Sequence, residues 1–457
     1  MIASSARTAP IAVRAVIVLG LLIAGPTWAC AETGTGNLGA SLPLWSIAPF
    51  AALLLAIAVL PLTARHWWES NRNKAVVSLI LGAPVGIWMG VLDVHVVAEV
   101  GGEFFSFIVL LGALYIISGG IYVRGAPSGT PLINTATLAI GSLLASVIGT
   151  TGASMVMIRP FLRANAHRTH RTHLVVFFIL LVANIGGSLT PLGDPPLYLG
   201  FLRGVPFFWT LNLWGPWALG VGSLLIVFHF VDDYWFERDD LATPGSLVEE
   251  VHQRAPMRIE GKVNILYLGG VIAAAFSSGV WHWPFGVREA VMAALTLASL
   301  RTTPAALRKE NEFTYHPIVE VAVLFAGIFL SMIPALAILN ARGAALGIER
   351  PWEFFWATGI LSGFLDNAPT YLTFLSLAQG LDLPAEVAGV PHAVLAAISV
   401  GAVFMGANSY IGNGPNFMVK SIAEAAGVRM PSFFGYLVRV QLVLLPLYAV
   451  LTWLFFS

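Results

Sequence analysis

Long apolar stretches recur along the whole chain, and most of them approach the length that crosses a bilayer. About 20 consecutive apolar residues form a helix that spans the hydrocarbon core. The pattern therefore predicts an all-α polytopic membrane protein. The predicted spans are Leu44–Leu62, Val76–Val94, Phe104–Val123, Leu174–Leu192, Trp209–Val231, Val263–Trp281, Arg288–Leu300, Pro317–Leu339, Pro391–Ile411 and Phe434–Phe456.

Two further apolar stretches carry a polar break at their centre. The stretch Leu132–Phe161 contains Thr150-Thr151-Gly152, and the stretch Trp352–Leu377 contains Asp366-Asn367-Ala368-Pro369. A continuous membrane helix does not favour such residues at its midpoint, because glycine, proline and unpaired polar groups all weaken it there. We expect each stretch to form a re-entrant helical hairpin with the break at its tip.

A second kind of break occurs once after each hairpin. Gly193-Asp194-Pro195-Pro196 lies 43 residues beyond Thr150 (150 to 193), and Gly412-Asn413-Gly414-Pro415 lies 46 beyond Asp366 (366 to 412). Broken apolar segments in corresponding positions of two halves indicate inverted-topology repeats with a binding site near the bilayer midplane. The expected alignment pairs Thr150 with Asp366, Thr151 with Asn367, Ser154 with Thr370, and Asp194 with Asn413.

The expected organisation follows from these breaks. Residues 44–231 form the first repeat, 232–262 a cytoplasmic linker and 263–457 the second repeat. Residues 1–31 resemble a signal peptide, because Arg7 and Arg14 precede an apolar run and Ala29-Cys30-Ala31 provides a cleavage pattern. An uncleaved first helix is the alternative. Cys30 is the only cysteine of the chain, so cleavage after Ala31 would leave none for disulfides or metal sites.

Composition and charge support a lipid environment. The chain is 57% hydrophobic and 11% charged, with a formal net charge of zero, whereas soluble domains carry about 25% charged residues. The lipid bilayer is the expected partner. Because the net charge is zero, no excess of positive charge indicates binding to nucleic acid. Basic residues gather at alternate span ends, which predicts a bacterial-type inner membrane with a periplasmic N-terminus and with the two hairpins opening to opposite sides.

Two carboxyl groups lie at membrane depth in this arrangement, at Asp194 and Asp366. Ionisable residues there are expensive and are functional by default. With hydroxyl and amide oxygens and the carbonyls exposed at a helix break, they predict a site for a hard cation, and desolvation lets a proton compete for the carboxylate. The candidate ion-binding residues are Asp366, Asp194, Asn367, Thr370, Asn413, Thr150, Thr151, Ser154, Ser188, Thr190 and Ser409, with Gly193, Gly412 and Gly414 as broken-helix backbone. Na⁺ is expected at Asp366, Asn367 and Asp194. For Asn184, Ser188 and Thr190, helix capping is an equal alternative.

Other polar groups have weaker signals. His167, His170 and His173 have a spacing that permits a shared metal, but no nearby carboxylate is evident, and a basic cytoplasmic loop explains them better. Glu320 is expected either to relay protons or to snorkel to the membrane surface. Lys420 and Glu424 are an i,i+4 pair that should neutralise each other.

At the breaks the chain resembles a known family. Asn184-Ile-Gly-Gly-Ser-Leu-Thr-Pro-Leu-Gly-Asp-Pro-Pro196, Leu365-Asp-Asn-Ala-Pro-Thr370 and Gly406-Ala-Asn-Ser-Tyr-Ile-Gly-Asn-Gly-Pro-Asn416 resemble the NhaD-type sodium/proton antiporters. These belong to the ion-transporter superfamily together with arsenite permeases and citrate or dicarboxylate carriers. The resemblance implies a scaffold domain and a mobile transport domain, a homodimer and an elevator motion.

One departure bears on the substrate. Dicarboxylate carriers of the superfamily have Ser-Asn-Thr at both hairpin tips, whereas this chain has Thr150-Thr151-Gly152 and Asp366-Asn367-Ala368. The added carboxylate disfavours an anion. We therefore expect not an enzyme but a Na⁺(Li⁺)/H⁺ antiporter without a cofactor, in which Na⁺ and H⁺ are the transported ions.

Other functions stay open at this point. An arsenite or citrate/dicarboxylate carrier of the same fold is the alternative. An intramembrane aspartyl protease is a remote one, because Leu192-Gly193-Asp194 resembles its Gly-Asp element but leaves the Asn413 break and both hairpin tips unexplained.

Overall fold

A computed structural model describes residues 35–125, 129–242, 258–281, 283–381 and 383–457. The predicted signal peptide and the middle of the predicted linker, 243–257, lie outside the described residues. The first described half contains α2 (Thr35–Ser41), η1 (Leu44–Ile47), α3 (Ala48–Thr63), α4 (Arg65–Trp68), α5 (Asn71–Leu92), α6 (Val94–Ser118), β1 (Tyr122–Arg124), α7 (Pro131–Ile148), α8 (Thr150–Ala164), α9 (Thr172–Leu181), η2 (Ile185–Leu189), α10 (Pro195–Leu202), η3 (Phe207–Leu213) and α11 (Trp214–Ala242).

The second half repeats the order of long helices, hairpin, broken helix and final helix. It contains β2 (Arg258–Glu260), α13 (Val263–Trp281), α14 (Val287–Thr302), α15 (Ala305–Glu310), α16 (His316–Ser331), α17 (Ile333–Arg342), η4 (Gly343–Leu346), α18 (Pro351–Phe364), α19 (Asn367–Gln379), α20 (His392–Met405), η5 (Gly406–Asn408), α21 (Gly414–Ala425), α22 (Phe433–Leu451) and η6 (Thr452–Phe456).

The described structure confirms an all-α polytopic membrane fold. Eight of its helices are long and apolar enough to cross a membrane. Large apolar side chains on their outer faces are exposed, for example Ile87 at 70% and Val91 at 82%, which suits contact with lipid rather than water. The strands β1 and β2 have three residues each and pair antiparallel. They form the one sheet among the described residues. The opposite orientation of the two halves across a membrane stays a prediction.

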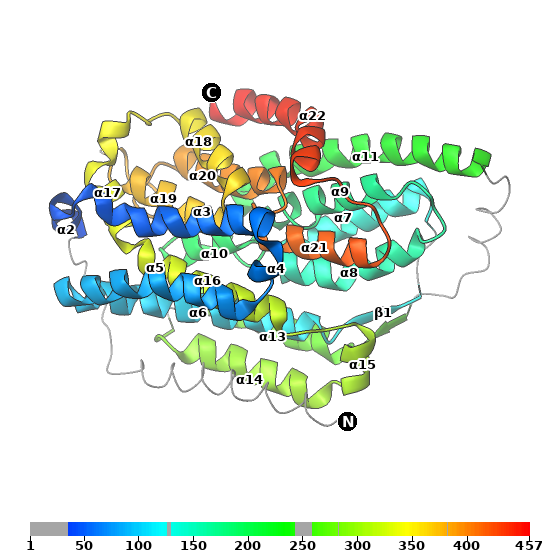
Figure 1. Ribbon diagram of the computed structural model, residues 1–457, viewed down its shortest axis with the longest axis horizontal. Coiled ribbons are helices and arrows are strands. Elements are labelled where there is room, and N and C mark those ends of the chain that lie inside the picture. Colours follow the sequence, from blue (N-terminus) through cyan, green and yellow to red (C-terminus); the bar gives the residue numbers. More distant parts are fainter. Residues whose placement is uncertain (1–34, 126–128, 243–257, 282, 382) are drawn as a thin grey trace.

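The helices form two packed groups, seen in Figure 1. In the lower part of the view α5, α6 and α16 pack together, α3 packs on α5 and α16, and α13 and α14 pack on α6. The other group contains the hairpins α7–α8 and α18–α19, the broken helices α9–α10 and α20–α21, and the final helices α11 and α22. Helices α6 and α10 are among the elements that join the groups, and α10 also packs against α19.

Several helices depart from their predicted bounds. Helix α6 begins at Val94 instead of Phe104 and ends at Ser118 instead of Val123. The stretch Pro317–Leu339, expected as one span, is bent by 43° between α16 and α17. Pro334 lies in the first turn of α17, where it lacks an N–H and its ring would clash with the carbonyl of Leu330 in a continuous helix. Helix α11 continues to Ala242, through the first residues of the segment expected as a linker.

Candidate functional site

Both hairpin tips and both helix breaks meet at one buried carboxyl group, that of Asp194. The side chain is 2% exposed. Thr150 donates its hydroxyl to Oδ1 at 2.8 Å, and Asn413 donates its amide to the same oxygen at 2.9 Å. Asn367 donates its amide to Oδ2 at 2.5 Å. The first hairpin, the second hairpin and the second broken helix therefore each supply one uncharged donor to a carboxyl group on the first broken helix.

The local sequence explains why the Asp194 side chain bonds to residues of other elements and not to its own helix. Asp194 is the N-cap of α10, and Pro195 and Pro196 follow in the first turn, where proline is preorganised and its missing N–H costs nothing. The carboxyl group does not cap its own helix. Asn413 occupies the same N-cap position of α21 and likewise makes no cap, so both side chains are free to meet.

Each break is folded by backbone contact between two glycines. A Cβ atom at Gly193 would lie 1.9 Å from the carbonyl oxygen of Gly187, and one at Gly412 would lie 2.5 Å from that of Gly406. No side chain fits at those distances, so Gly193 and Gly412 permit the crossing. Gly414 has open space around its Cβ position, and nothing in the structure explains a glycine there.

The hairpin tips dock on these glycines through their backbone. Thr150 donates its N–H to the carbonyl of Gly193 at 2.7 Å, and Asn367 donates its N–H to that of Gly412 at 3.2 Å. Thr150 thus corresponds to Asn367, which corrects the expected alignment by one residue. The reason is that Gly149, with φ of 82°, fills the N-cap position of α8 that Asp366 fills in α19.

Asp366 lies at the edge of the site and is half-buried. Its carboxyl group accepts the N–H of Ala368 at 3.0 Å, as an N-cap does. It is close enough for its charge to act on that of Asp194, and Asn367 follows it directly in sequence. The Oδ1 atom of Asn367 is buried without a hydrogen-bond partner. A carbonyl oxygen of this kind is a ready ligand for a hard cation.

Several predicted site hydroxyls hold the backbone of the breaks. Ser188 donates to the carbonyl of Ile185 at 2.9 Å. Thr190 donates to the carbonyl of Ser146, and Ser409 accepts the N–H groups of two residues that follow it, at 3.2 and 3.1 Å. Thr370 bonds back to the carbonyl of Asp366 at 2.8 Å. These hydroxyl groups bond to backbone groups, and none of these bonds involves the Asp194 carboxyl group.

Two predicted residues stand apart from the Asp194 carboxyl group. Thr151 is half-buried and makes no hydrogen bond to another described residue. The Ser154 hydroxyl is buried without a partner. Of the predicted residues at the first tip, Thr150 is the one whose side chain bonds to the Asp194 carboxyl group.

A hydrogen-bonded pair of amide side chains, Asn184 and Asn416, joins the two breaks. This pair was not predicted as part of the site. Asn184 donates to Asn416 at 2.6 Å. Asn416 donates to the carbonyls of Gly406 and Ser409 at 2.9 and 2.8 Å. Asn416 lies in the first turn of α21, three residues after Asn413, and an amide so close to the second break is the sequence signal that points to it.

Helix dipoles do not decide the sign of a charge that this site would bind. The N-termini of α8, α10, α19 and α21 converge on the site and favour negative charge. Helices α7 and α18 end at the same tips, and their C-termini favour positive charge. The charges of the side chains are not balanced. Two carboxyl groups are present, and no described Lys, Arg or His hydrogen-bonds or ion-pairs with either of them.

A catalytic aspartyl dyad needs two carboxyl groups that share a proton. In the described structure no hydrogen bond joins Asp194 and Asp366, and the amide of Asn367 occupies the second oxygen of Asp194. The geometry does not support the protease alternative.

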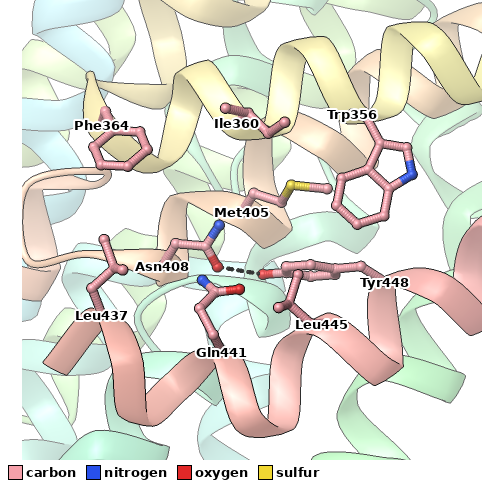
Figure 2. A pocket seen from close by; sticks show the side chains of 9 residues that line it. All are labelled: Trp356, Ile360, Phe364, Met405, Asn408, Leu437, Gln441, Leu445 and Tyr448. Atoms are coloured by element: carbon pink, nitrogen blue, oxygen red, sulfur yellow. Dashed lines mark hydrogen bonds between the residues drawn. The ribbon is translucent and has the colours of Figure 1, made fainter.

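A cavity of ≈ 180 Å³ lies beside the site, between α18, η5 and α22. Figure 2 shows the amides of Asn408 and Gln441 turned into it, with the Tyr448 hydroxyl donating to Asn408 at 2.9 Å. The other lining side chains are Trp356, Ile360, Phe364, Met405, Leu437 and Leu445. None of the residues that bond to Asp194 lines this cavity.

The weaker candidates have defined partners. Lys74, 4% exposed, forms a 2.5 Å ion pair with Glu320, so Glu320 joins α16 to α5, and its expected role in proton relay or snorkelling stays a prediction. Lys420 and Glu424 pair at 2.8 Å, as predicted.

Two of the three neighbouring histidines have carboxylate partners, contrary to expectation: His170, in the loop before α9, contacts Asp239, and His173, in the first turn of α9, contacts Asp232. Across the described residues, no group of three or more His, Cys, Asp or Glu is arranged to hold a metal ion.

Comparison with known proteins gives a family. Residues 39–456 match the CitMHS_2 family, described as "Putative citrate transport". The chain is 26% identical over 420 residues to the uncharacterized transporter Mb2703 of Mycobacterium bovis and, equally, to the uncharacterized transporter Rv2684 of Mycobacterium tuberculosis. Each alignment covers 84% of this chain and 94% of the relative. These matches identify a transporter of the ion-transporter superfamily; they do not identify the NhaD group within it.

Proposed function

Because the chain belongs to the CitMHS_2 family of transporters, we propose that it is a secondary transporter that binds a small cation at Asp194 and Asp366 and exchanges Na⁺ or Li⁺ for H⁺. The site alternates between the two sides of an inner membrane as the hairpins and broken helices move against α5, α6 and α16. The homodimer and the elevator motion that the resemblance implies belong to this proposal.

The carrying observation is the unbalanced charge of Asp194. A buried carboxylate that has lost its water costs several kcal/mol unless it is paired. Thr150, Asn367 and Asn413 supply hydrogen bonds but no positive charge. A bound proton or a bound metal cation supplies it, and both cannot occupy the same lone pair. This competition is the minimum that cation–proton exchange requires.

The nearby oxygens suit a hard monovalent cation. The buried Oδ1 of Asn367 lacks a partner, and Asp366 precedes it at the edge of the site. Carboxylate and carbonyl oxygens are the ligands that hard cations prefer. Asp366, Asn367 and Asp194 would therefore hold Na⁺ together, with Asp366 as the oxygen donor nearest to solvent.

A citrate carrier is the second candidate, because the family is described by citrate transport. A tricarboxylate would be repelled by Asp194 and Asp366 unless cations accompanied it. On this alternative the same carboxyl groups bind the accompanying cations, and citrate uptake depends on a cation gradient.

Proteoliposomes with an internal pH-sensitive dye separate the candidates. With a preset pH gradient, Na⁺ or Li⁺ should dissipate the gradient, and Asp366→Asn should abolish this response. Asp93→Asn is a matched control, because Asp93 also caps a helix N-terminus but lies at the exposed start of α6. Absence of any response to Na⁺ or Li⁺, together with cation-dependent uptake of labelled citrate, would replace the exchanger by the citrate carrier.

A further inference from the structure

The cavity between α18, η5 and α22 (Figure 2) has no part in the hydrogen bonds of Asp194. In the first half of the chain, the final helix α11 packs directly against the hairpin leg α7. In the second half, this cavity of ≈ 180 Å³ lies between the final helix α22 and the hairpin leg α18. The two halves therefore differ here, and the second half has room for a ligand beside its helix break.

Two amide groups in the cavity have unused hydrogen-bonding capacity. Figure 2 shows the side chains of Asn408 and Gln441 turned into the cavity. The Oδ1 atom of Asn408 accepts the Tyr448 hydroxyl at 2.9 Å. Neither the NH₂ group of Asn408 nor the amide of Gln441 bonds to another residue that the structure describes. Two NH₂ donors and the Oε1 acceptor of Gln441 therefore remain for a ligand.

The position of Gln441 along its helix makes these free groups informative. Gln441 lies near the middle of α22, eight residues after Phe433 and ten before Leu451, and α22 is one of the helices long and apolar enough to cross a membrane. Its amide therefore lies deep in the hydrocarbon region, where water is absent and an unpaired polar group is costly. A partner with a hydrogen-bonding group would remove that cost.

The rim of the cavity faces lipid. Ile360, Phe364 and Leu445 line it and are 54%, 48% and 48% exposed, and large apolar side chains with this exposure on a membrane helix suit contact with acyl chains. A ligand would therefore reach the cavity from within the bilayer. Such a ligand is uncharged, because transfer of an unpaired ion into hydrocarbon costs far more than transfer of a neutral polar group.

The volume and the lining of the cavity favour a single aromatic ring. An apolar cavity of about 150 Å³ binds benzene, so ≈ 180 Å³ has room for one ring with a small polar substituent. Trp356, Phe364 and Tyr448 contribute aromatic rings to the lining, and Met405 contributes a thioether. Both kinds of group pack favourably on an aromatic ring.

We propose that this cavity binds an uncharged phenol that enters from the bilayer. A phenol hydroxyl is both a donor and an acceptor, so its oxygen would accept from the NH₂ group of Asn408 while its O–H donates to Oε1 of Gln441. The ring would then lie among the aromatic and thioether side chains of the lining. A purely apolar molecule of the same size would fill the space but leave both amides unpaired.

A bound phenol would act on the second hairpin and the second break together. Phe364 lines the cavity and precedes Asp366 by two residues, and Asn408 lines it and precedes Gly412 by four. A ligand that contacts both side chains would hold the end of α18 and the segment η5 against α22. Binding itself does not depend on the proposed exchange of cations, since no residue that bonds to Asp194 lines the cavity.

Fluorine NMR on the purified full chain in lipid nanodiscs tests this site without any transport measurement. The probe is para-fluorophenol, and para-fluorotoluene, which has a methyl group in place of the hydroxyl, is the matched control probe. Nanodiscs without protein give the partitioning of each probe into lipid. We expect saturable binding of para-fluorophenol that excess phenol displaces, with an affinity about tenfold higher than that of para-fluorotoluene, the factor that one hydrogen bond can supply.

Two variants and a control locate the binding. Gln441→Leu removes a hydrogen-bonding partner and keeps an apolar side chain, so it should weaken binding of para-fluorophenol about tenfold and leave that of para-fluorotoluene unchanged. Leu437→Trp enlarges a side chain of the lining and should abolish saturable binding of both probes. Leu442→Gln is the matched control, because Leu442 lies outside the cavity and is 77% exposed, and it should change neither affinity.

Three outcomes would overturn the proposal. Equal affinities of the native chain for the two probes would refute it, and so would an affinity for para-fluorophenol that Gln441→Leu retains in full. If an acyl chain or a second copy of the chain filled the cavity, neither probe would bind saturably, and the proposal would also be wrong. Failure of Na⁺/H⁺ exchange in proteoliposomes would leave the result unaffected, because the readout does not depend on the transported ion.

Discussion

Replacement of Asp194 by Asn separates the charge of this side chain from its shape. An Asn at 194 keeps one oxygen that accepts from Thr150 and Asn413, which now bond to Oδ1 of the carboxyl group. Its new NH₂ group would face the NH₂ of Asn367. That conflict is avoided if the Asn367 amide turns over, because its Oδ1 has no partner in the native structure and can then accept.

The expected effect on stability is small because two terms oppose each other. Hydrogen bonds to a charged group contribute about 1.5–3 kcal/mol and neutral ones about 0.5–1.5 kcal/mol, so three bonds that lose their charge cost about 3–5 kcal/mol together. The same substitution removes the penalty of burying a carboxylate, which is also several kcal/mol. We expect the free energy of unfolding to change by about 2 kcal/mol or less, in either direction, from this balance.

Transport should respond quite differently. Asp194→Asn has no group that binds a proton or balances a cation, so cation-dependent proton movement in proteoliposomes should be lost. Thermal unfolding followed by tryptophan fluorescence, measured on the same preparation, reports stability. Exchange at the native rate would refute the role given to Asp194. A loss of stability far beyond the estimate would show that the three contacts contribute mainly to folding.

Three further predictions concern the supports of the site. Gly193→Ala places a methyl group 1.9 Å from a backbone oxygen and should sharply reduce the yield of folded protein in size-exclusion chromatography. Gly414→Ala is the control, because the space around that position is open, and it should leave the yield unchanged. Equal yields would contradict the requirement for glycine where the backbone of residue 193 contacts Gly187. Glu320→Gln leaves Lys74 buried without a countercharge and should lower the free energy of unfolding by about 3–5 kcal/mol, while Lys74→Met combined with Glu320→Leu should restore most of it; a tolerated single variant would show that Lys74 finds water. Asn416→Ala removes hydrogen bonds to Asn184 and to two carbonyls and should weaken the apparent affinity for Na⁺ in the dye assay more than the maximal rate; an unchanged affinity would make Asn416 a purely structural residue.

The breaks were predictable from sequence because their cause is local. Asp366-Asn367-Ala368-Pro369 and Gly193-Asp194-Pro195-Pro196 combine proline with a carboxyl group inside apolar runs, and this combination disfavours a continuous membrane helix. The helix starts follow from the same residues, since Asp366 caps α19 with its side chain and a proline lies in the first turn of both α10 and α21. The predicted location of the carboxyl groups inside the membrane then identified them as candidate site residues, because burying a charge there is costly whatever the surrounding fold.

The contacts between breaks were not predictable, because they depend on packing between distant segments. The alignment of the tips differed by one residue, since a glycine at 149 and an aspartate at 366 serve the same N-cap position. The Asn184–Asn416 bond joins residues 232 positions apart. The contacts of His170 with Asp239 and of His173 with Asp232 were missed for the same reason: the partners lie 69 and 59 residues apart, and membrane helices bring them together without any local pattern.

Under the proposed exchange of cations, the unequal chemistry of the two halves would couple ion binding to the two hairpins. The first half supplies the carboxyl group of Asp194, and the corresponding position of the second half supplies the amide of Asn413. Thr150 and Asn367 lie on different hairpin tips and donate to opposite oxygens of that one carboxyl group. When a cation or proton neutralises Asp194, both charge-assisted bonds weaken together, because a neutral acceptor holds a donor less strongly. On this proposal, ion binding would change how firmly both hairpins are held, which a carboxyl group placed at only one tip could not achieve.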